Sequence, residues 1–406
     1  MTELNCVCMF SNFYPPVVSG SSIQVASLCR ELVKRGVCVV VITAKVVDGS
    51  AEYEFIDGVH IYRLPAFRLP KIALGFNFPW ISFTFTPGNV RRIKRIIEKH
   101  DPQMLHLHNY MFDLAFSAVL MRMQTKIPLV ITIHTYLKHP SYVLNIIFFL
   151  IERIMLTFPV IRQADCIICP DWNVQQYTGL AFGNVPTALV PYGIVVQHPE
   201  KEMVTKIKKR YGLVGKRIIL SLGHLHDMRN RKDLIEAMPQ VLKEFPNAVL
   251  FIAGAVYTDF PIALVSKLGL QNSVIFAGSV PHIDIPALLK IADLESHWLN
   301  QNEPAKTSLG IASLEAMYLG KVVLAAANPD TYGNGLLQNG ENIVFVKPGN
   351  TIQLAQTIVA LLRDDVRRST IGQRASQTIH EHFSWDSVCE QTLRVYQQAI
   401  QKKASK

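Results

Sequence analysis

The chain has 406 residues, more than one hydrophobic core usually organises, so we expect two domains. Apolar residues make up 49% of it and charged residues 18%, a balance that excludes an intrinsically disordered protein. The net charge is +10, from 41 Lys and Arg against 31 Asp and Glu. This excess favours anionic partners but does not choose among phosphorylated small molecules, nucleic acid and anionic lipid.

Strand and helix patterns alternate along the first half. An apolar strand at 6–10 leads through a loop rich in Pro, Gly and Ser at 12–22 to a helix at 23–35, which has apolar residues on one face. The unbroken apolar run at 37–43 is typical of a parallel strand covered on both faces. Further buried strands are predicted at 104–107, 129–133, 166–169 and 188–190.

A second series follows a charged stretch at 193–215, which fits a hinge and a short helix. Helices are predicted at 231–245 and 311–319, and strands at 217–222, 248–253, 274–277 and 322–325. Right-handed βαβ connections then give an α/β fold with ligands bound at the carboxyl ends of the strands.

Two Rossmann-like domains are therefore expected, at 1–195 and 196–383, with a last helix at about 384–402 that packs back on the first. The isoleucines between Cys166 and Cys169 favour a buried strand over a zinc site, and seven scattered cysteines argue against a disulfide scaffold. No signal peptide is seen, and the apolar run at 142–150 is shorter than the roughly 20 residues that span a bilayer. We expect a cytoplasmic protein.

Two of three candidate phosphate loops connect a predicted strand to the helix after it. In the loop at 14–22, Gly20 lets the backbone turn closely before a helix N-terminus, although an ordinary βα loop explains it equally well. The loop at 223–232 carries Arg229, Arg231 and Lys232, whose charges suit phosphate; the alternative is a solvated basic helix start.

The third candidate loop, at 307–315, leads into a helix. Its amides at 308–310 would point at an anion, and Glu315 lies on the same face further along. A carboxylate among apolar neighbours is costly unless it is bonded, and a ribose diol would satisfy it. The alternative is an ion pair with a structural lysine.

Taken in order, these segments resemble glycosyltransferase family 4, whose members are retaining enzymes of the GT-B fold. The resemblance spans nearly the whole chain. It is carried by FYPPVVSGSS, RIILSLGHLHDMRN, FAGSVPHIDIPALLKIAD, TSLGIASLEAMYLGKVVLAA, GLLQNGENIVFVKPGN and FSWDSV. It implies two Rossmann-like domains facing across a cleft, and transfer of a sugar from a nucleoside diphosphate to an acceptor.

The resemblance also implies a role for each matching residue. Glu315 takes the second Glu position of the family's E-x7-E motif and should bind the ribose, while Arg229 takes the place of a phosphate-binding Lys. His134 matches a catalytic-site His near the transferred sugar, and His108 faces the acceptor side; for either alone, a core histidine is the alternative. Donor binding is further implied for Gly20, Ser21, His224, Val280, Ser308, Leu309, Gly310 and Ile311.

Three positions depart from the family pattern. Thr307 replaces the first Glu of the motif but can still bond a sugar hydroxyl, and we count it with the catalytic residues. His224 replaces the usual Arg and carries charge only when protonated. Ser21 replaces a glycine and would crowd the phosphate, while Glu303 and Lys306 lie near enough in sequence to compensate.

The chain contains no Asp-x-Asp motif, so we predict neither a metal ion nor a cofactor. Arg229, helix dipoles and backbone amides would instead meet the charge of the leaving diphosphate. The acceptor is unidentified, with lipid-linked and glycan acceptors both open. A nucleotide-sugar epimerase and a catalytically degenerate partner subunit remain alternatives, because the fold alone does not choose between them.

Basic and aromatic residues concentrate between 63 and 99 and suit an anionic membrane surface or a lipid-linked acceptor. An aromatic core segment followed by a solvated basic helix is the alternative. Nucleic acid is not expected, because no nucleic-acid-binding fold surrounds the segment. The residues are Arg63, Phe67, Arg68, Lys71, Phe76, Phe78, Trp80, Phe83, Phe85, Arg91, Arg92, Lys94, Arg95 and Lys99.

Overall fold

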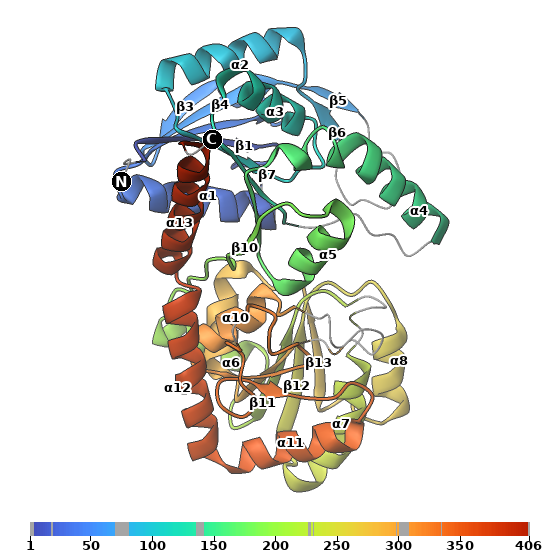
Figure 1. Ribbon diagram of the computed structural model, residues 1–406. Coiled ribbons are helices and arrows are strands. Elements are labelled where there is room, and N and C mark those ends of the chain that lie inside the picture. Colours follow the sequence, from blue (N-terminus) through green and yellow to red (C-terminus); the bar gives the residue numbers. More distant parts are fainter. Residues whose placement is uncertain are drawn as a thin grey trace. The chain divides into compact units, whose positions relative to one another are not determined.

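The chain folds into two compact units. The first is Met1–Gly193 with Trp385–Lys406, and the second is Ile194–Ser384. The helix α13 (Trp385–Ala404) belongs to the first unit and packs against α1 (Gly20–Lys34) (Figure 1). The computed structural model describes residues 4–17, 19–69, 81–134, 142–225, 229, 231–297, 299, 308–333 and 335–404.

The first unit is built on a sheet that is parallel except for β3 at one edge. β2, β4 and β3 lie on one side of β1, and β7, β8, β9 and β10 follow in chain order on the other, which is the doubly wound arrangement. The order is β10 (Thr187–Leu189), β9 (Cys166–Cys169), β8 (Leu129–Thr132), β7 (Met104–His108), β1 (Cys6–Ser11), β2 (Cys38–Lys45), β4 (Val59–Pro65) and β3 (Tyr53–Ile56). The buried strands agree with those predicted, whereas β3 and β4 have exposed or half-buried positions that hid them from an apolar-run search.

Helices cover both faces of this sheet. They are α1, α2 (Pro87–His100), α3 (Leu114–Thr125), α4 (Tyr142–Ile151), α5 (Trp172–Phe182) and α13, with a π-helical turn at Glu152–Thr157, a 3-10 turn at Ile161–Gln163 and a small β5–β6 ribbon (Phe67–Leu69, Ile81–Phe83). Helix α1 starts at Gly20, three residues before the predicted start. Ser19 and Ser22 form a capping box there, each hydroxyl accepting the other's backbone N–H.

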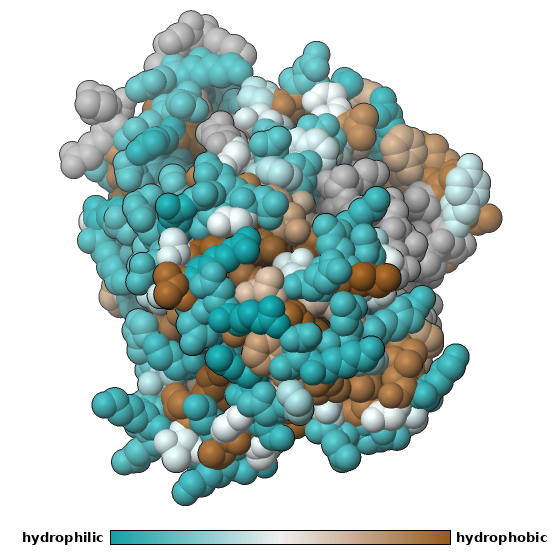
Figure 2. All heavy atoms as spheres, turned by 90° about the horizontal axis from the view of Figure 1, so that it is seen from below, coloured by the Kyte–Doolittle hydropathy of each residue, from teal (hydrophilic) through white to brown (hydrophobic). Residues whose placement is uncertain are grey.

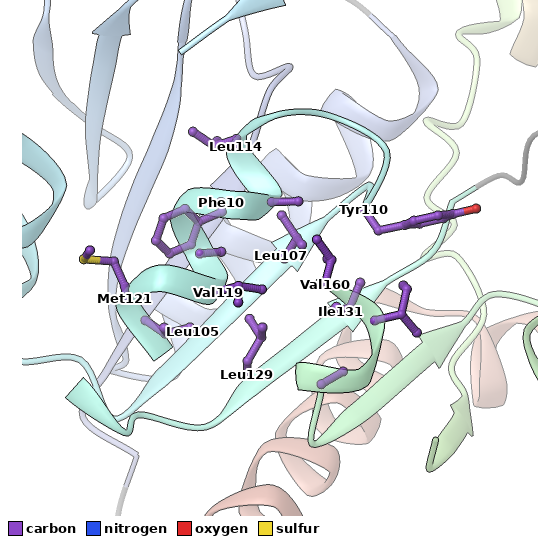
Figure 3. Packing of buried hydrophobic residues seen from close by; sticks show 14 of the residues in the cluster. Phe10, Leu105, Leu107, Tyr110, Leu114, Val119, Met121, Leu129, Ile131 and Val160 are labelled. Atoms are coloured by element: carbon purple, nitrogen blue, oxygen red, sulfur yellow. The ribbon is translucent and has the colours of Figure 1, made fainter. Parts of the chain in front are cut away.

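Each face of the sheet carries its own core. On the side of α2 and α3, Phe10 and Leu107 of the central strands pack with Leu114 and Val119 of α3 (Figure 3). On the other side α1 and α13 cover the strands, and Tyr396 of α13 is fully buried. Burial on both faces explains why the central strands read as unbroken apolar runs.

The second unit repeats the doubly wound order around a wholly parallel sheet. The order is β13 (Val274–Gly278), β12 (Ala248–Ala253), β11 (Arg217–Leu222), β14 (Leu294–Ser296), β15 (Val322–Ala325) and β16 (Val344–Phe345). Its helices are α6 (Lys201–Arg210), α7 (Lys232–Glu244), α8 (Phe260–Lys267), a 3-10 turn at His282–Asp284, α9 (Ile285–Ile291), α10 (Ile311–Tyr318), α11 (Thr351–Arg363) and α12 (Asp365–His382). The strand order reverses between β11 and β14, the point at which such sheets bind ligands.

The structure shows where several of the basic residues predicted to contact a membrane lie. Arg63 is buried and paired with Glu54, so the prediction that it is one of the segment's surface cations is wrong. Arg68 and Arg92 form surface ion pairs, and Lys71, Phe76, Phe78 and Trp80 lie outside the described residues. Among the helices that the structure describes, none is both long and apolar enough to cross a bilayer. On the face shown in Figure 2, hydrophilic side chains cover most of the surface and hydrophobic ones form smaller patches.

Candidate functional site

A hollow of about 280 Å³ lies at the carboxyl ends of the second unit's strands. Its walls come from the residues after β11, β12 and β13 and from the first turns of α10. His224, Val280, Ile311 and Glu315, four of the residues predicted for donor binding, line it together. The sheet topology thus brings together residues that are far apart in the sequence, such as His224 and Glu315, which are separated by 91 positions.

Two glycines form the floor of the hollow where β11 and β12 end. Gly254 has a φ of +153°, and a Cβ there would lie 2.3 Å from the carbonyl oxygen of Gly223. Gly223 itself has a φ of +114°. Only glycine combines these dihedral angles with so close an approach of two backbones. Gly254 was not among the residues predicted from the sequence.

Gly254→Ala is therefore expected to destabilise the second unit by about 3 kcal/mol, because backbone strain and overpacking add. Binding of the nucleoside diphosphate predicted from the sequence should weaken as well, since the methyl group displaces the Gly223–His224 backbone. Gly269→Ala is the control: φ is +67° there but no atom lies within 4 Å of the new Cβ, so only about 1 kcal/mol of strain is expected. Equal thermal unfolding midpoints for the two variants would contradict the prediction.

His224 is held in one tautomer by the backbone. Its Nδ1 accepts the N–H of Ala255 at 3.0 Å, so the ring hydrogen lies on Nε2. A second proton on Nδ1 would displace Ala255. His224 therefore offers a ligand the N–H of Nε2, a hydrogen-bond donor that does not depend on a charge on the ring.

His224→Ala should weaken binding of the nucleoside diphosphate predicted from the sequence about 2–10-fold, the effect of losing one hydrogen bond. Because salt screens charges but not a hydrogen bond from Nε2, the ratio of the variant's dissociation constant to that of the wild type should be the same at low and high salt. Calorimetric titrations at two ionic strengths measure it. A ratio that shrinks with added salt would indicate a charged imidazole.

Helix α10 begins at the hollow. Gly310 is its N-cap, and its N–H donates to His297 Nε2 at 3.0 Å, so the expectation that this amide meets the donor is wrong for this conformation. The amides of Ile311 and Ala312 come next; within the described part of the chain no acceptor is found for either. They are left to face an anion at the positive end of the helix dipole.

Glu315 lies on the same side of α10 as Ile311, one turn further along, and lines the hollow. No hydrogen bond or ion pair joins its carboxyl group to any residue that the structure describes, so the alternative of an internal ion pair finds no support there. Burial raises the pKa of Glu315 to about 7. A half-buried carboxylate without a partner is costly, and hydroxyl donors from a ligand would relieve that cost.

Arg231 does not serve as a phosphate ligand, contrary to the sequence-based expectation. Its guanidinium is buried and donates to the carbonyls of Leu222, Gly223 and His224 at 2.9 Å each, and to that of Arg229 at 2.5 Å. Burial, with the charge of Arg229, lowers the pKa of Arg231 to about 10, so it stays charged at neutral pH. Arg231 thus shapes the loop on which His224 and Arg229 lie.

Arg229, the predicted phosphate ligand, is half-buried, and burial lowers its pKa. Ser308 is half-buried before α10, whereas Leu309 is buried and its carbonyl accepts from Tyr332 Oη at 3.4 Å. Thr307, with Glu303 and Lys306, lies outside the described residues.

Two polar residues beside the switch point escaped the sequence analysis. Glu295 is fully buried on β14, and burial raises its pKa to about 8, partly offset by Ser313 and Arg231. It is therefore largely protonated at neutral pH. His297, at the end of the same strand, holds the start of α10 through Gly310. A Glu and a His within an apolar strand, LESHWL, were the available signal.

Two known protein-family patterns match successive parts of the chain. The pattern described as Glycosyltransferase Family 4 matches residues 18–198, and that described as Glycosyl transferases group 1 matches 203–378. The two matches lie in successive units and together span most of the chain. The chain belongs to glycosyltransferase family 4.

Relatives and solved structures agree with this assignment. An uncharacterised glycosyltransferase of Methanocaldococcus jannaschii is 25% identical over 97% of this chain and 98% of its own. N-acetyl-alpha-D-glucosaminyl L-malate synthase of Bacillus anthracis is 22% identical, over 94% of both. Sucrose-phosphate synthase of Thermosynechococcus elongatus (TM-score 0.72, 20% identity, 98% of this chain and 100% of that one) and Anabaena HepE with UDP (0.69, 16%, 97% and 100%) share the fold, which is GT-B.

The remaining family positions lie in the first unit. Both ring nitrogens of His134 are engaged, Nδ1 with Tyr192 Oη at 3.2 Å and Nε2 with His108 Nδ1 at 3.1 Å. Burial lowers the pKa of both imidazoles, to about 4 for His134, so they are neutral. For His134 to bond a sugar, one of these hydrogen bonds must open.

Gly20 and Ser21 form the first turn of α1 in this glycosyltransferase. A Cβ at Gly20 would meet no atom within 4 Å, so the local fold does not require glycine there. The hydroxyl of Ser21 lies 3.3 Å from that of Ser19.

Proposed function

We propose that the chain transfers a hexosyl group from a nucleoside diphosphate sugar, with retention of anomeric configuration and without a divalent metal at the diphosphate. Glu315 carries this proposal. It is a partly buried carboxyl group in a hollow, without a partner among the described residues, one turn beyond two amides that face the same space. A ribose diol on the carboxylate and a phosphate on the amides would satisfy both.

In the proposed reaction, the acceptor hydroxyl attacks the anomeric carbon on the face that the diphosphate leaves. The bond between that carbon and the diphosphate oxygen breaks, and the hydroxyl proton passes to the departing phosphate. Arg229, His224 Nε2–H and the amides of Ile311 and Ala312 stabilise the negative charge that develops. The chain contains no Asp-x-Asp motif, which supports stabilisation of this charge by protein groups without a metal ion.

His134, His108 and Thr307 are proposed for the sugar and acceptor side, on the strength of the family pattern. Either a glycan or a lipid-linked alcohol would supply the hydroxyl. Peripheral contact with the cytoplasmic face of a membrane would bring the latter within reach. Flotation with anionic liposomes tests that contact, and a protein that stays at the bottom of the gradient counts against it.

The proposal is tested first by binding. HepE was solved with UDP, so UDP, GDP and ADP form the first thermal-shift panel. One of them should raise the melting temperature, because a ligand that binds only the folded state stabilises it. The matching sugar nucleotide should then be hydrolysed slowly, with proton NMR showing the anomer of the first product and with excess EDTA leaving the rate unchanged. Binding without turnover would favour a degenerate partner subunit, and a changed sugar without transfer an epimerase.

A further inference from the structure

A cluster of one cysteine and two histidines lies in the first unit, at the edge of the sheet where its parallel strands begin. Cys38 begins β2, His60 is the second residue of β4, and His100 is the last residue of α2. One ligand atom from each of the three lies within 4.8 Å of the others. Since β2 and β4 both start here, the cluster lies at the amino-terminal edge of the strands, away from the carboxyl edge where such sheets bind substrates.

We propose that Cys38, His60 and His100 bind a zinc ion. A thiolate with two imidazoles is a ligand set that zinc prefers, and a water molecule would complete the tetrahedron. Zinc–ligand distances of about 2.0–2.3 Å place ligand atoms roughly 3.3–3.6 Å apart, so each pair of ligand atoms needs to close by at most about 1.5 Å. On binding, the Cys38 thiol loses its proton to solvent, and the resulting thiolate sulfur bonds to the zinc ion.

The surroundings orient both imidazoles. Tyr53 Oη lies 3.0 Å from His60 Nδ1, and Tyr62 Oη lies 2.8 Å from His100 Nε2. Each ring therefore has one nitrogen fixed by a hydroxyl and keeps a second for the metal, an arrangement usual for histidine ligands. The two rings lie 4.6 Å apart between centroids.

The electrostatics of the cluster are mixed but favour a cation. His100 ends α2, so the negative end of that helix dipole lies at the cluster. Lys99 opposes this, with its Nζ 3.5 Å from Tyr62 Oη, but its side chain is exposed and its charge is screened by solvent. Because the ligands come from β2, β4 and α2, zinc would join the sheet edge to the helix that covers it.

Cobalt and zinc titrations of the full chain, first freed of metal with a chelator, test the proposal. One equivalent of Co²⁺ should give a thiolate-to-cobalt charge-transfer band, which Zn²⁺ abolishes. Cys38→Ser should remove the band, and His60→Gln or His100→Gln should weaken zinc binding at least 100-fold. Tyr53→Phe should weaken it roughly 10–100-fold, because that hydroxyl only orients a ligand.

Two matched variants serve as controls. Cys166→Ser changes another half-buried cysteine at the first position of a strand, and His198→Gln changes an exposed histidine of the second unit. Both should bind zinc as the wild type does. Zinc should also raise the melting temperature of the wild type but not of Cys38→Ser, while nucleotide affinity stays unchanged. The proposal is overturned if the wild type shows no charge-transfer band, or if Cys38→Ser, shown to be folded by circular dichroism, keeps it.

Discussion

Glu315→Gln is expected to weaken nucleoside diphosphate binding roughly 10–100-fold, because a hydrogen bond to a charged group contributes about 1.5–3 kcal/mol. The amide keeps the shape of the side chain but loses the charge that would accept from two ribose hydroxyls. Titration calorimetry with the nucleotide selected by the panel measures the change. Glu244→Gln removes a carboxylate from an exposed ion pair at the end of α7 and should leave affinity unaltered.

The same carboxyl group should make binding depend on pH. Its pKa of about 7 means that the ionised form is lost as pH falls through neutrality. Affinity of the wild type should therefore drop about tenfold for each pH unit below 7 and be level above it. In Glu315→Gln this dependence should disappear. An identical slope in both proteins would show that another group titrates.

Stability should change in the opposite direction. Burial raises the pKa of Glu315 from 4.5 to about 7, so the folded state binds this proton more tightly than the unfolded chain. The nucleotide-free wild type therefore loses stability as pH rises from 4.5 to 7, and no more above that. Glu315→Gln should be more stable than the wild type above pH 7 by up to about 3 kcal/mol. Urea unfolding of the wild type and of Glu315→Gln below pH 4.5 and above pH 7 measures this difference. A residue with a structural role would instead lose stability on substitution.

Arg231→Met is expected to cost about 3–5 kcal/mol of folding free energy, because removing the guanidinium leaves several buried carbonyls without donors. The loop after β11 should lose its shape, and nucleotide affinity should fall even though Arg231 touches no ligand in the proposed site. Urea unfolding measures the stability and calorimetry the affinity.

Arg363→Met provides the matched control for Arg231. Arg363 is an exposed arginine of α11, paired with Glu244 at 2.6 Å, and an exposed pair contributes at most about 1 kcal/mol. If both variants unfold at the same urea concentration, the carbonyl contacts of Arg231 do not hold the loop. Arg229→Met distinguishes the two arginines of the loop, because it should impair nucleotide binding with a smaller effect on stability than Arg231→Met.

Much of the architecture could be predicted from the sequence because it depends on local pattern. Unbroken apolar runs such as 37–43 and 248–253 mark strands that helices bury on both faces, and these elements were predicted within a few residues. Short or half-exposed elements were missed. β14 has three residues, two of them polar, and β3 lies exposed at an edge, so neither presents a periodic apolar signal.

Within the site, the order of motifs along the chain was enough to nominate Glu315, His224, Val280 and Ile311, because doubly wound sheets bring successive strand ends together. Which polar group bonds which could not be predicted in this way. Arg229 and Arg231 are both arginines in one loop, and nothing in the sequence pattern indicates that Arg231 donates to the carbonyls of that loop.

The sequence by itself determined the family, the doubly wound α/β fold and the identity of the residues at the strand ends, since these follow from periodicity and motif order. Tertiary structure alone decided the tautomer of His224, the engagement of Gly310 by His297 and the proximity of Cys38 to His60 and His100. Hydrogen bonds and metal-ligand sets depend on distances of a few ångströms between residues remote in the chain, and such distances exist only once the sheets and helices have packed.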